Sequence, residues 1–417
     1  MAWHPRDRSG STRVVDLDHA ATTRPRPEVV AAMEPFLTDR YGNPSGAHAT
    51  ARDAVRALDE AREQVADVLG CTPGEVVFTS GGTESDVHAV SGGLPPRPGV
   101  PVCGAAEHPA VLRTVEALGG EVVRVDPAGR PDLAELADVL ERRGGADVLE
   151  RRGVADVLER RGGVSVVSVM LANNELGTVT DLRPVAEVIR RCAPGVPLHT
   201  DAVQAAPWLD LRERAEVADL VSVSAHKFGG PRGAGVLVVR DGLAIRPLLP
   251  GGAQERGRRS GSVDVAGAVG LATALVATAA ERATVGARVA ALRDALVGRL
   301  GDAGAGVRPT LGADVAGEVL PNFAHVRVSG VEAEPLLYLL DEAGLRVSSA
   351  SSCASGAHRP SHVLTAIGAA SGGAALRLTL GATTTADDVD HAAAVLLGVV
   401  SYLRDRSPAD RSPVAPG

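Results

Sequence analysis

The chain has 417 residues, of which 45% are hydrophobic and 23% charged, a composition typical of a globular protein with one large or two ordinary domains. Its formal net charge of −8 and its four phenylalanines disfavour a nucleic-acid-binding surface, which needs basic patches and stacking aromatic side chains. No apolar run reaches the ~20 residues of a membrane-spanning helix, and the polar start has no signal-peptide core. The four cysteines lack paired spacing, which favours a reducing compartment, so we expect a cytoplasmic location.

The first part of the sequence predicts alternating strands and helices. A short strand near 14–18 precedes two helices, at 27–37 and 51–69, the second of which has apolar residues at helical spacing. A strand at 75–79 then stops at a glycine-containing run, Ser80–Ser85, that opens a helix. Further strands are expected near 100–103, 121–125, 164–171, 198–201, 219–224 and 236–239. This alternation indicates a mostly parallel sheet covered on both faces.

Residues 137–163 contain a tandem repeat of three near-identical nonapeptides. Repeats this short are not the unit of a solenoid, which has ~20–50 residues. We interpret them as a duplication that lengthens one surface helix or loop. An arginine-rich docking arm is the less favoured alternative, because each copy also carries aspartate and glutamate.

From about Val265 the pattern changes. A long alanine-rich helix at 266–300 leads to strands near 322–328 and 375–380, with helices at 334–343 and 387–403. We therefore expect an α/β fold with a large domain at 18–262 and a smaller α+β domain formed by 1–17 and 263–417. The tail after 407 has a composition typical of disorder.

Polar residues follow several of the predicted strands, at the ends where open α/β sheets bind ligands. Gly81-Gly82-Thr83 starts a helix, and such a start can bind an anion or be an ordinary capped turn. His108, Asn174 and Asp201 follow three other strands. Lys227 ends a fifth strand, where a lysine is either a solvated charge or an amine for covalent chemistry on a carbonyl.

Taken together, these groups match the needs of pyridoxal 5'-phosphate. Its phosphate needs an anion site, its aldehyde needs an amine, and its ring nitrogen needs a carboxylate. A nicotinamide site would instead need Gly-x-Gly-x-x-Gly after a strand, and the glycines of Gly229–Gly235 have the wrong spacing.

In its ordered motifs the chain resembles the cysteine desulfurases of the NifS/IscS type, in the class V aminotransferase superfamily. The resemblance covers almost the whole sequence and implies the pyridoxal phosphate transferase fold type I. The motifs that carry it are Asp18–Thr23, Tyr41–Ser45, Ser80–Glu84, Glu107-His108, Asn173–Glu175, His199–Gln204, His226-Lys227, Gly257–Ser262, Ser348–Cys353 and Arg377–Gly381.

The resemblance implies roles around the cofactor ring. Lys227 would bind the aldehyde and later move protons at the substrate α-carbon. Asp201 would pair with the ring nitrogen and Gln204 would hydrogen-bond the ring hydroxyl. His108 would stack on the ring and assist acid–base steps.

It also implies how the cofactor phosphate and the substrate are held. The phosphate would be bound by the Gly82 backbone and the side chains of Thr83, Ser224 and His226, with Ser262 reaching the other subunit of a homodimer. Asn174, at the cofactor, would hold the substrate carboxylate together with Arg377, whose guanidinium can bind bidentately. Arg377 could instead be a surface salt-bridge partner.

Cys353 is the expected nucleophile, on a run of small residues that suits a mobile sulfur carrier. With His358 and His362 it could form a metal cluster, but zinc sites usually need four ligands and no second cysteine is near, so we expect no metal. Cys71 and the two other cysteines are expected to be ordinary core or surface residues.

The predicted function is conversion of L-cysteine to L-alanine, with a persulfide on Cys353 passed to a sulfur-acceptor protein of an iron–sulfur, tRNA or other thiolation pathway. No direct contact with nucleic acid or membrane is expected. One alternative is a selenocysteine lyase or another class V lyase or aminotransferase. A non-enzymatic sulfur-trafficking scaffold is a further one. Ala225 departs from the glycine common in the family, which matters only if that position needs a positive φ.

Overall fold

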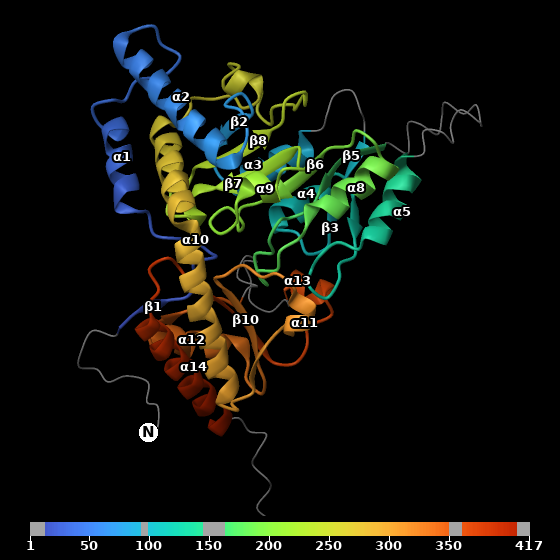
Figure 1. The fold of residues 1–417 in the computed structure, drawn as a ribbon, viewed down its shortest axis with the longest axis vertical. Coiled ribbons are helices and arrows are strands. Elements are labelled where there is room, and N and C mark those ends of the chain that lie inside the picture. Colours follow the sequence, from blue (N-terminus) through green and yellow to red (C-terminus); the bar gives the residue numbers. More distant parts are fainter. Residues whose placement is uncertain (1–12, 93–98, 145–162, 350–360, 407–417) are drawn as a thin grey trace, which may run out of the picture. The chain divides into compact units, whose positions relative to one another are not determined.

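The computed structural model describes residues 13–92, 99–144, 163–349 and 361–406 (Figure 1). The chain divides into two compact units. The larger unit consists of 21–174 and 178–283, and the smaller unit consists of 1–20, 175–177 and 284–417. The domain limits expected at 18–262 and 263–417 stay a prediction. Cys353, most of the tandem repeat and the tail after 407 lie outside the described residues.

A seven-stranded sheet forms the centre of the larger unit, in the order β2-β8-β7-β6-β5-β3-β4. Six strands point the same way, because β8 alone is antiparallel to its neighbours β7 and β2. The strands are β2 (Val76–Thr79), β3 (Gly99–Gly104), β4 (Glu121–Val123), β5 (Gly163–Ser168), β6 (Leu198–Asp201), β7 (Leu220–Ser224) and β8 (Gly235–Val239). Nearly all residues of β2, β5, β6, β7 and β8 are buried, as expected for a sheet covered on both faces.

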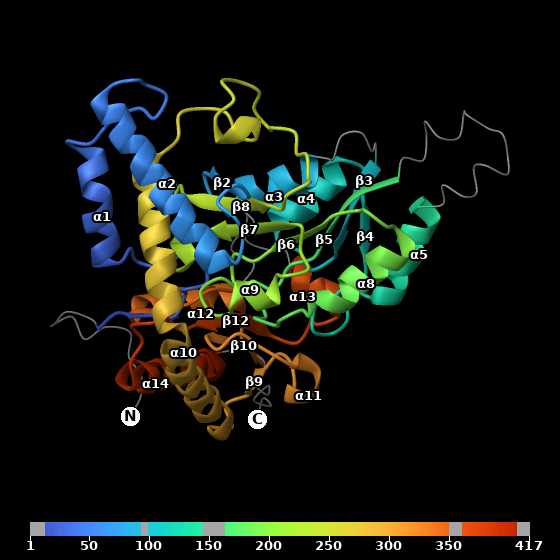
Figure 2. The same ribbon diagram turned by 45° about the horizontal axis from the view of Figure 1, so that its top comes forward.

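Helices cover both faces of this sheet (Figure 2). The connections from β2 to β3 and from β3 to β4 run one way across the sheet, whereas those from β4 to β5 and β5 to β6 run back. Because such crossovers are right-handed, the helices of the two sets lie on opposite faces. The first set is α3 (Gly82–Ser91) and α4 (Pro109–Ala117), and the second is α5 (Leu133–Gly144) and α8 (Leu182–Cys192).

In two other helices of the larger unit, local sequence features explain where the helix begins or ends. In α2 (Ala49–Leu69) the buried residues recur at helical spacing, and the helix stops at Gly70, whose φ of 66° suits glycine. Helix α1 (Pro27–Leu37) starts at a proline, whose missing N–H costs nothing in the first turn. The other elements are α9 (Leu211–Arg214) and the 3₁₀ turns η1 (Ala225–Lys227) and η2 (Glu255–Gly257).

Helix α10 (Val265–Asp302) begins in the larger unit and ends in the smaller one. It is long and apolar enough to be a candidate membrane span, but 56% of its most apolar window is buried inside the protein. That degree of burial is typical of the core helix of a folded domain.

The smaller unit contains two small sheets. In one, β1 (Val15–Asp16) pairs in parallel with β11 (Leu345–Arg346). In the other, β10 (Phe323–Val328) lies between β12 (Ala374–Thr379) and β9 (Val307–Pro309), antiparallel to both. Its helices are α11 (Ala313–Ala316), α12 (Ala333–Glu342), α13 (His362–Ala366) and α14 (Ala386–Arg406).

Candidate active site

The carboxyl ends of five parallel strands of the larger unit bring most predicted site residues to one edge of the sheet. Strands β2, β3, β5, β6 and β7 all point towards this edge. The residues that follow them are Gly81–Thr83, Glu107-His108, Asn173-Asn174, Asp201–Gln204 and Ser224–Lys227. The expected assembly of the larger unit's site groups therefore follows from the sheet topology.

The glycine cup, Ser80–Glu84, lies at the start of α3. Gly81 has a φ of 142°, which only glycine adopts readily, and a methyl group on Gly82 would come within 2.8 Å of Val203 Cγ2. The Ser224 hydroxyl lies 3.8 Å from where a side chain on Gly81 would begin. Backbone N–H groups at a helix start, next to a hydroxyl, form a site for an anion such as phosphate.

Lys227 lies in η1, directly after β7, and its Nζ donates a hydrogen bond to the Ala21 carbonyl at 3.0 Å. It is the only lysine among 417 residues, a fact that the prediction from its position did not use. Lys227 is therefore the one side-chain amine that could bind an aldehyde, and it lies at the carboxyl edge of the sheet. Next to it, His226 Nδ1 lies 3.1 Å from Thr22 Oγ1.

Burial, with the positive charges of Lys227 and Arg232, lowers the pKa of His226 to about 4. At neutral pH the ring is thus uncharged and can act at an anion site only through hydrogen bonds. Ala225 fits its position, because the described non-glycine residues with positive φ are Ala253, Glu255 and Arg256. The added methyl group is accordingly accommodated.

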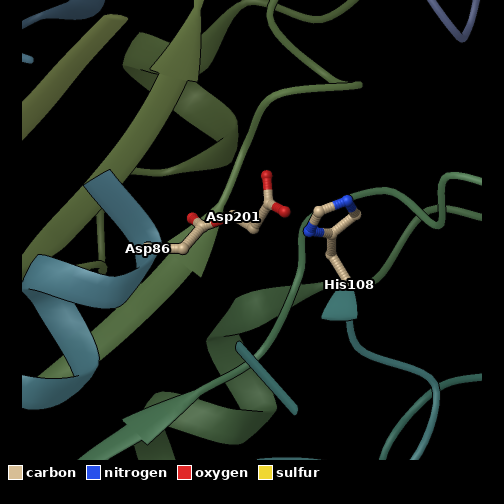
Figure 3. A group of neighbouring side chains, drawn as sticks. All are labelled: Asp86, His108 and Asp201. Carbon is tan, nitrogen blue, oxygen red and sulfur yellow. The ribbon is translucent and has the colours of Figure 1, made fainter. Parts of the chain in front are cut away.

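Asp201, His108 and Asp86 form a compact cluster, with one donor atom of each within 4.8 Å of the others (Figure 3). One oxygen of Asp201 accepts the Val203 N–H at 2.9 Å. His108 caps α4 by accepting the Ala110 N–H on Nδ1 at 3.2 Å, so that a ring proton is carried on Nε2. His108 therefore has a structural role in addition to its position beside Asp201.

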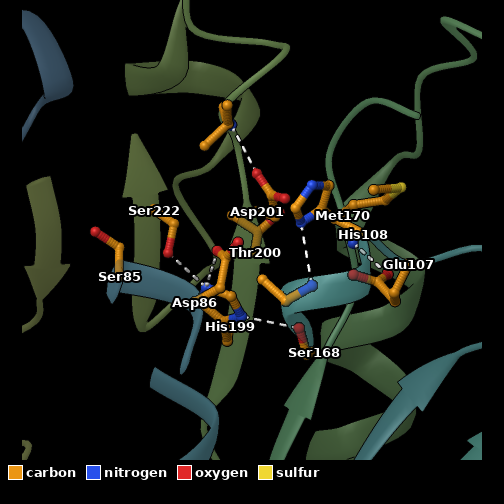
Figure 4. Close-up of polar contacts among 12 residues, drawn as sticks. Ser85, Asp86, Glu107, His108, Ser168, Met170, His199, Thr200, Asp201 and Ser222 are labelled. Atoms are coloured by element: carbon orange, nitrogen blue, oxygen red, sulfur yellow. Dashed lines mark hydrogen bonds and ion pairs between the residues drawn. The ribbon is translucent and has the colours of Figure 1, made fainter. Parts of the chain in front are cut away.

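Three buried carboxyl groups meet here: Asp86, Glu107 and Asp201 (Figure 4). Burial and the nearby Asp201 raise the pKa of Asp86 and of Glu107 well above the usual range. Burial also raises the pKa of Asp201, but His108, the Val203 N–H and Lys227 oppose that rise. Asp201 is therefore the carboxyl group that can hold the negative charge of the cluster.

The same three groups are spaced as a metal ion could bind them. A cation would have to displace the proton of Asp86 and would still have fewer than the four ligands of a structural zinc site. An organic cation beside Asp201 requires neither the loss of the Asp86 proton nor a fourth ligand. The cluster thus fits a protonated ring nitrogen better than it fits a metal ion.

Asn174 and Gln204 are both buried at the carboxyl edge, whereas Ser262 is exposed beyond η2. The segment before Ser262 is strained, with positive φ at Glu255 and its neighbours. A buried ion pair holds it, in which Arg62 donates to both Glu255 oxygens at 2.9 and 2.6 Å. Ser262 therefore emerges from a fixed loop.

Arg377 belongs to the smaller unit, on β12. Its side chain is buried and its Nη2 donates to Asp18 Oδ1 at 2.8 Å. Arg377 is thus a salt-bridge partner, as the alternative interpretation expected, but its own side chain is buried and not at the surface. Its backbone N–H also donates to the Ser348 carbonyl at 2.7 Å, just before the segment that carries Cys353.

Glu175, which the sequence analysis gave no role, lies in the same unit. It accepts a hydrogen bond from the Ser361 hydroxyl at 2.5 Å, at the start of α13. Burial raises the pKa of Glu175 to about 7, against the opposing effects of Ser361 and Arg377. Its polar run, Asn173–Glu175, was noted in the sequence, but its partner is 186 residues away.

Cys353 and His358 lie outside the described residues. Of the cysteines that are described, Cys103 is buried and Cys71 is partly buried. Burial raises the pKa of Cys71 to about 11 and that of Cys103 further. Both are therefore thiols at neutral pH, the unreactive form.

The fold and the site together define a class of protein. A mostly parallel sheet with a glycine cup, a carboxylate and one lysine at its carboxyl edge is the fold type I of pyridoxal phosphate-dependent transferases. The family model described as "Aminotransferase class-V" matches residues 15–146 and 154–392. The chain belongs to this family, and within it to the cysteine desulfurases. The unmatched residues 147–153 lie inside the tandem repeat.

Individual relatives agree with this placement. The chain is 41% identical over 410 residues to the "IscS-like cysteine desulfurase" of Mycobacterium tuberculosis, covering 93% of this chain and 96% of that protein. A solved structure described as "NIFS-LIKE PROTEIN" matches with a TM-score of 0.80 and 32% identity over 94% of this chain and 100% of that one. Another, "SspA in complex with cysteine", matches with a TM-score of 0.69 and 28% identity over 88% and 98%.

Proposed function

We propose that this protein is a pyridoxal phosphate-dependent cysteine desulfurase that converts L-cysteine to L-alanine and passes the sulfur to an acceptor protein. Relatives named cysteine desulfurase, and a similar structure in complex with cysteine, support the reaction. The observation that carries the proposal is the single lysine, Lys227, at the same sheet edge as the glycine cup and Asp201.

The residues of the larger unit fit the cofactor. The glycine cup with Ser224, Thr83 and neutral His226 suits a phosphate, and Asp201 suits a protonated ring nitrogen. When bound, the cofactor supplies an aldehyde that condenses with amines and a ring that accepts an electron pair from the substrate α-carbon. Gln204 would hydrogen-bond the ring hydroxyl, and Asn174 would contact the cofactor.

The protein's own groups then handle protons. The Lys227 amine would hold the cofactor aldehyde, and as a free amine it would be the base that takes the α-proton and later returns a proton. Asp201 would hold the negative charge opposite the ring nitrogen, because His108 and Lys227 oppose the rise in its pKa that burial causes. His108, whose Nδ1 accepts the Ala110 N–H, would exchange protons through Nε2.

Substrate and sulfur are handled by the smaller unit and by Asn174. Arg377 has a planar guanidinium, already held in place by Asp18, that suits the substrate carboxylate. The Cys353 thiolate attacks the substrate sulfur, so that an S–S bond forms as the Cβ–S bond breaks. The electron pair of the broken bond stays on Cβ, which is protonated to give alanine. Cys353 retains the sulfur as a persulfide for transfer.

The cofactor link can be tested by chemical trapping. Borohydride should fix the cofactor on Lys227 and block tryptic cleavage after this residue, so that the peptide 215–232 survives uncut. The untreated protein, cut between residues 227 and 228, is the control. Absence of the modified peptide from protein purified with the cofactor would refute the proposal.

The proposal also concerns the oligomeric state, the cellular location and the sulfur acceptor. Ser262 would reach the phosphate of the other subunit, which makes the enzyme a homodimer. A cytoplasmic location stays a prediction. The acceptor is proposed as a protein of a thiolation or iron–sulfur pathway.

A further inference from the structure

Asp86 is a buried acid that the proposed reaction does not use. It lies on α3, the helix that begins at the glycine cup, and only 1% of its surface is exposed. It forms a hydrogen bond with the Ser222 side chain of β7, and its Oδ1 lies 3.7 Å from His199 Nε2 of β6. Figure 4 shows Asp86 next to His199, which lies on the same strand as Asp201, and Ser222 on the neighbouring strand.

The described polar side chains next to Asp86, His199 and Ser222, carry no positive charge that could balance a carboxylate. His199 lies between two hydroxyls, with Nδ1 2.8 Å from Ser168 Oγ and Nε2 2.9 Å from Ser222 Oγ. Burial lowers the pKa of His199 to about 3, so its ring is neutral. Among the described residues, Oδ1 of Asp86 is buried without a hydrogen-bond partner. A carboxylate there would be costly, whereas a carboxylic acid is tolerated.

The charged neighbours of Asp86 favour the same form. Asp201 from β6 and Glu107 after β3 are both carboxyl groups, and each disfavours a negative charge on Asp86. The basic groups that act on this pair, His108 and Lys227, lower the pKa of Asp201, and neither is among the causes that shift the pKa of Asp86. Two carboxyl groups this close carry one negative charge at far lower cost than two.

We propose that Asp86 is a positioning residue of the cofactor site, a neutral carboxylic acid that leaves Asp201 as the single carboxylate of the pair. This inference rests on the proposed function only where it concerns the cofactor. Through Ser222 and α3, Asp86 also joins the glycine cup to the strands that carry Asp201 and Lys227. A second negative charge at this place would raise the pKa of Asp201 and so favour its neutral form.

The sign of the effect on stability follows from the raised pKa of Asp86. Between the unfolded pKa, about 3.9, and the folded one, the native state binds the extra proton, so native stability falls as the pH rises. Asp86→Asn keeps the shape and the polar contact but cannot ionise. In cofactor-free protein we expect Asp86→Asn to raise Tm by about 3 °C or more at pH 8. This gain in Tm should increase as the pH rises from 5 to 8.

A matched control has the opposite sign. Asp53 is a partly exposed carboxyl group whose pKa is lowered by its hydrogen bond to Arg40. Asp53→Asn should lower Tm or leave it unchanged, with no gain that grows above pH 5. If Asp86→Asn lowers Tm over the whole range, Asp86 is a satisfied carboxylate and the proposal is wrong.

Cofactor affinity tests the positioning role. At pH 8 we expect Asp86→Asn to change the Kd for pyridoxal phosphate less than ~3-fold, because it removes no charge. Asp201→Asn removes a negative charge and should weaken cofactor binding at least ~30-fold. Asp86→Ala should weaken cofactor binding ~10-fold, whereas Asp86→Asn should keep it.

The proposal fails if Asp86→Asn weakens cofactor binding as much as Asp201→Asn, or if a folded Asp86→Ala variant binds the cofactor normally. If the alanine variant does not fold, the Tm and Kd of Asp86→Asn decide. If the unmodified protein binds no cofactor, the proposed function fails, whereas the Tm series still tests Asp86.

Discussion

The two units present their functional groups in different ways. In the larger unit, neighbouring strands of one sheet deliver His108, Asp201 and Lys227 to the same edge. In the smaller unit, Arg377 is held by Asp18, which is 359 residues away in the sequence. The sheet topology alone explains the first arrangement, whereas the second depends on individual long-range contacts. Mutations should therefore separate cofactor binding from substrate binding.

The largest effect is expected at Lys227. Lys227→Arg keeps a positive charge but removes the primary amine, so turnover should fall at least ~10³-fold, since the nucleophile itself is lost. The glycine cup and Asp201 remain, so the variant should still bind the cofactor without a covalent bond. Alanine formation from L-cysteine measures turnover, and absorbance after gel filtration measures bound cofactor. A variant with near-normal turnover would contradict the proposed site.

A change in the smaller unit should affect the substrate and spare the cofactor. Arg377→Lys loses the bidentate fork, so we expect kcat/KM for L-cysteine to fall ~100-fold while the Kd for pyridoxal phosphate stays within ~2-fold. Arg346→Lys, at an exposed position of strand β11 in the other small sheet, is the matched control and should have no effect. Equal losses of substrate and cofactor binding in Arg377→Lys would remove the distinction between the units.

Glu175 provides a pH-dependent test in the smaller unit. With an unfolded pKa of about 4.5 and a folded pKa of about 7, it binds a proton more tightly when folded, so its cost to stability appears as the pH rises from 4.5 to 7. Glu175→Gln can still accept from Ser361 and should gain about 3 kcal/mol at pH 8 and nothing at pH 4. Denaturant unfolding at both pH values measures this gain. The exposed change Glu334→Gln controls for the chemistry, and a gain that is equal at both pH values would disprove the assignment.

The smallest effect is expected from the tandem repeat. Deletion of 146–163 joins Gly145 to Val164 and recreates the Arg-Gly-Gly-Val sequence that now runs into the start of β5. Because the repeat is predicted to lengthen a surface helix or loop, we expect turnover and Tm to change by less than ~2-fold and ~2 °C. Most of this segment lies outside the described residues. Loss of folding or of turnover would give the repeat a role in structure or function.

The sequence predicted the strand-based part of the protein well. The helix at 27–37 and the strand at 198–201 have the predicted limits, and the long helix predicted at 266–300 extends over Val265–Asp302. These segments have strong periodicity or clear stop signals. The strand predicted at 164–171 ends at Ser168, because an apolar run alone does not show where ladder pairing stops.

The contacts that set charge could not be predicted in the same way. That Asp86 meets Asp201, and that Glu175 meets Ser361, depends on how separate segments pack. Their raised pKa values come from burial, which a single sequence does not reveal. The lone lysine, in contrast, was visible in the sequence and needed only to be counted.

The most direct test of the account is to locate the sulfur after one turnover. With L-cysteine and no acceptor, peptide mass mapping should find one extra sulfur atom on Cys353 and none on Cys71, Cys103 or Cys192. Cys353→Ser should keep the cofactor on Lys227 but form no persulfide. Persulfide on another cysteine, or normal alanine formation by Cys353→Ser, would contradict the proposed mechanism.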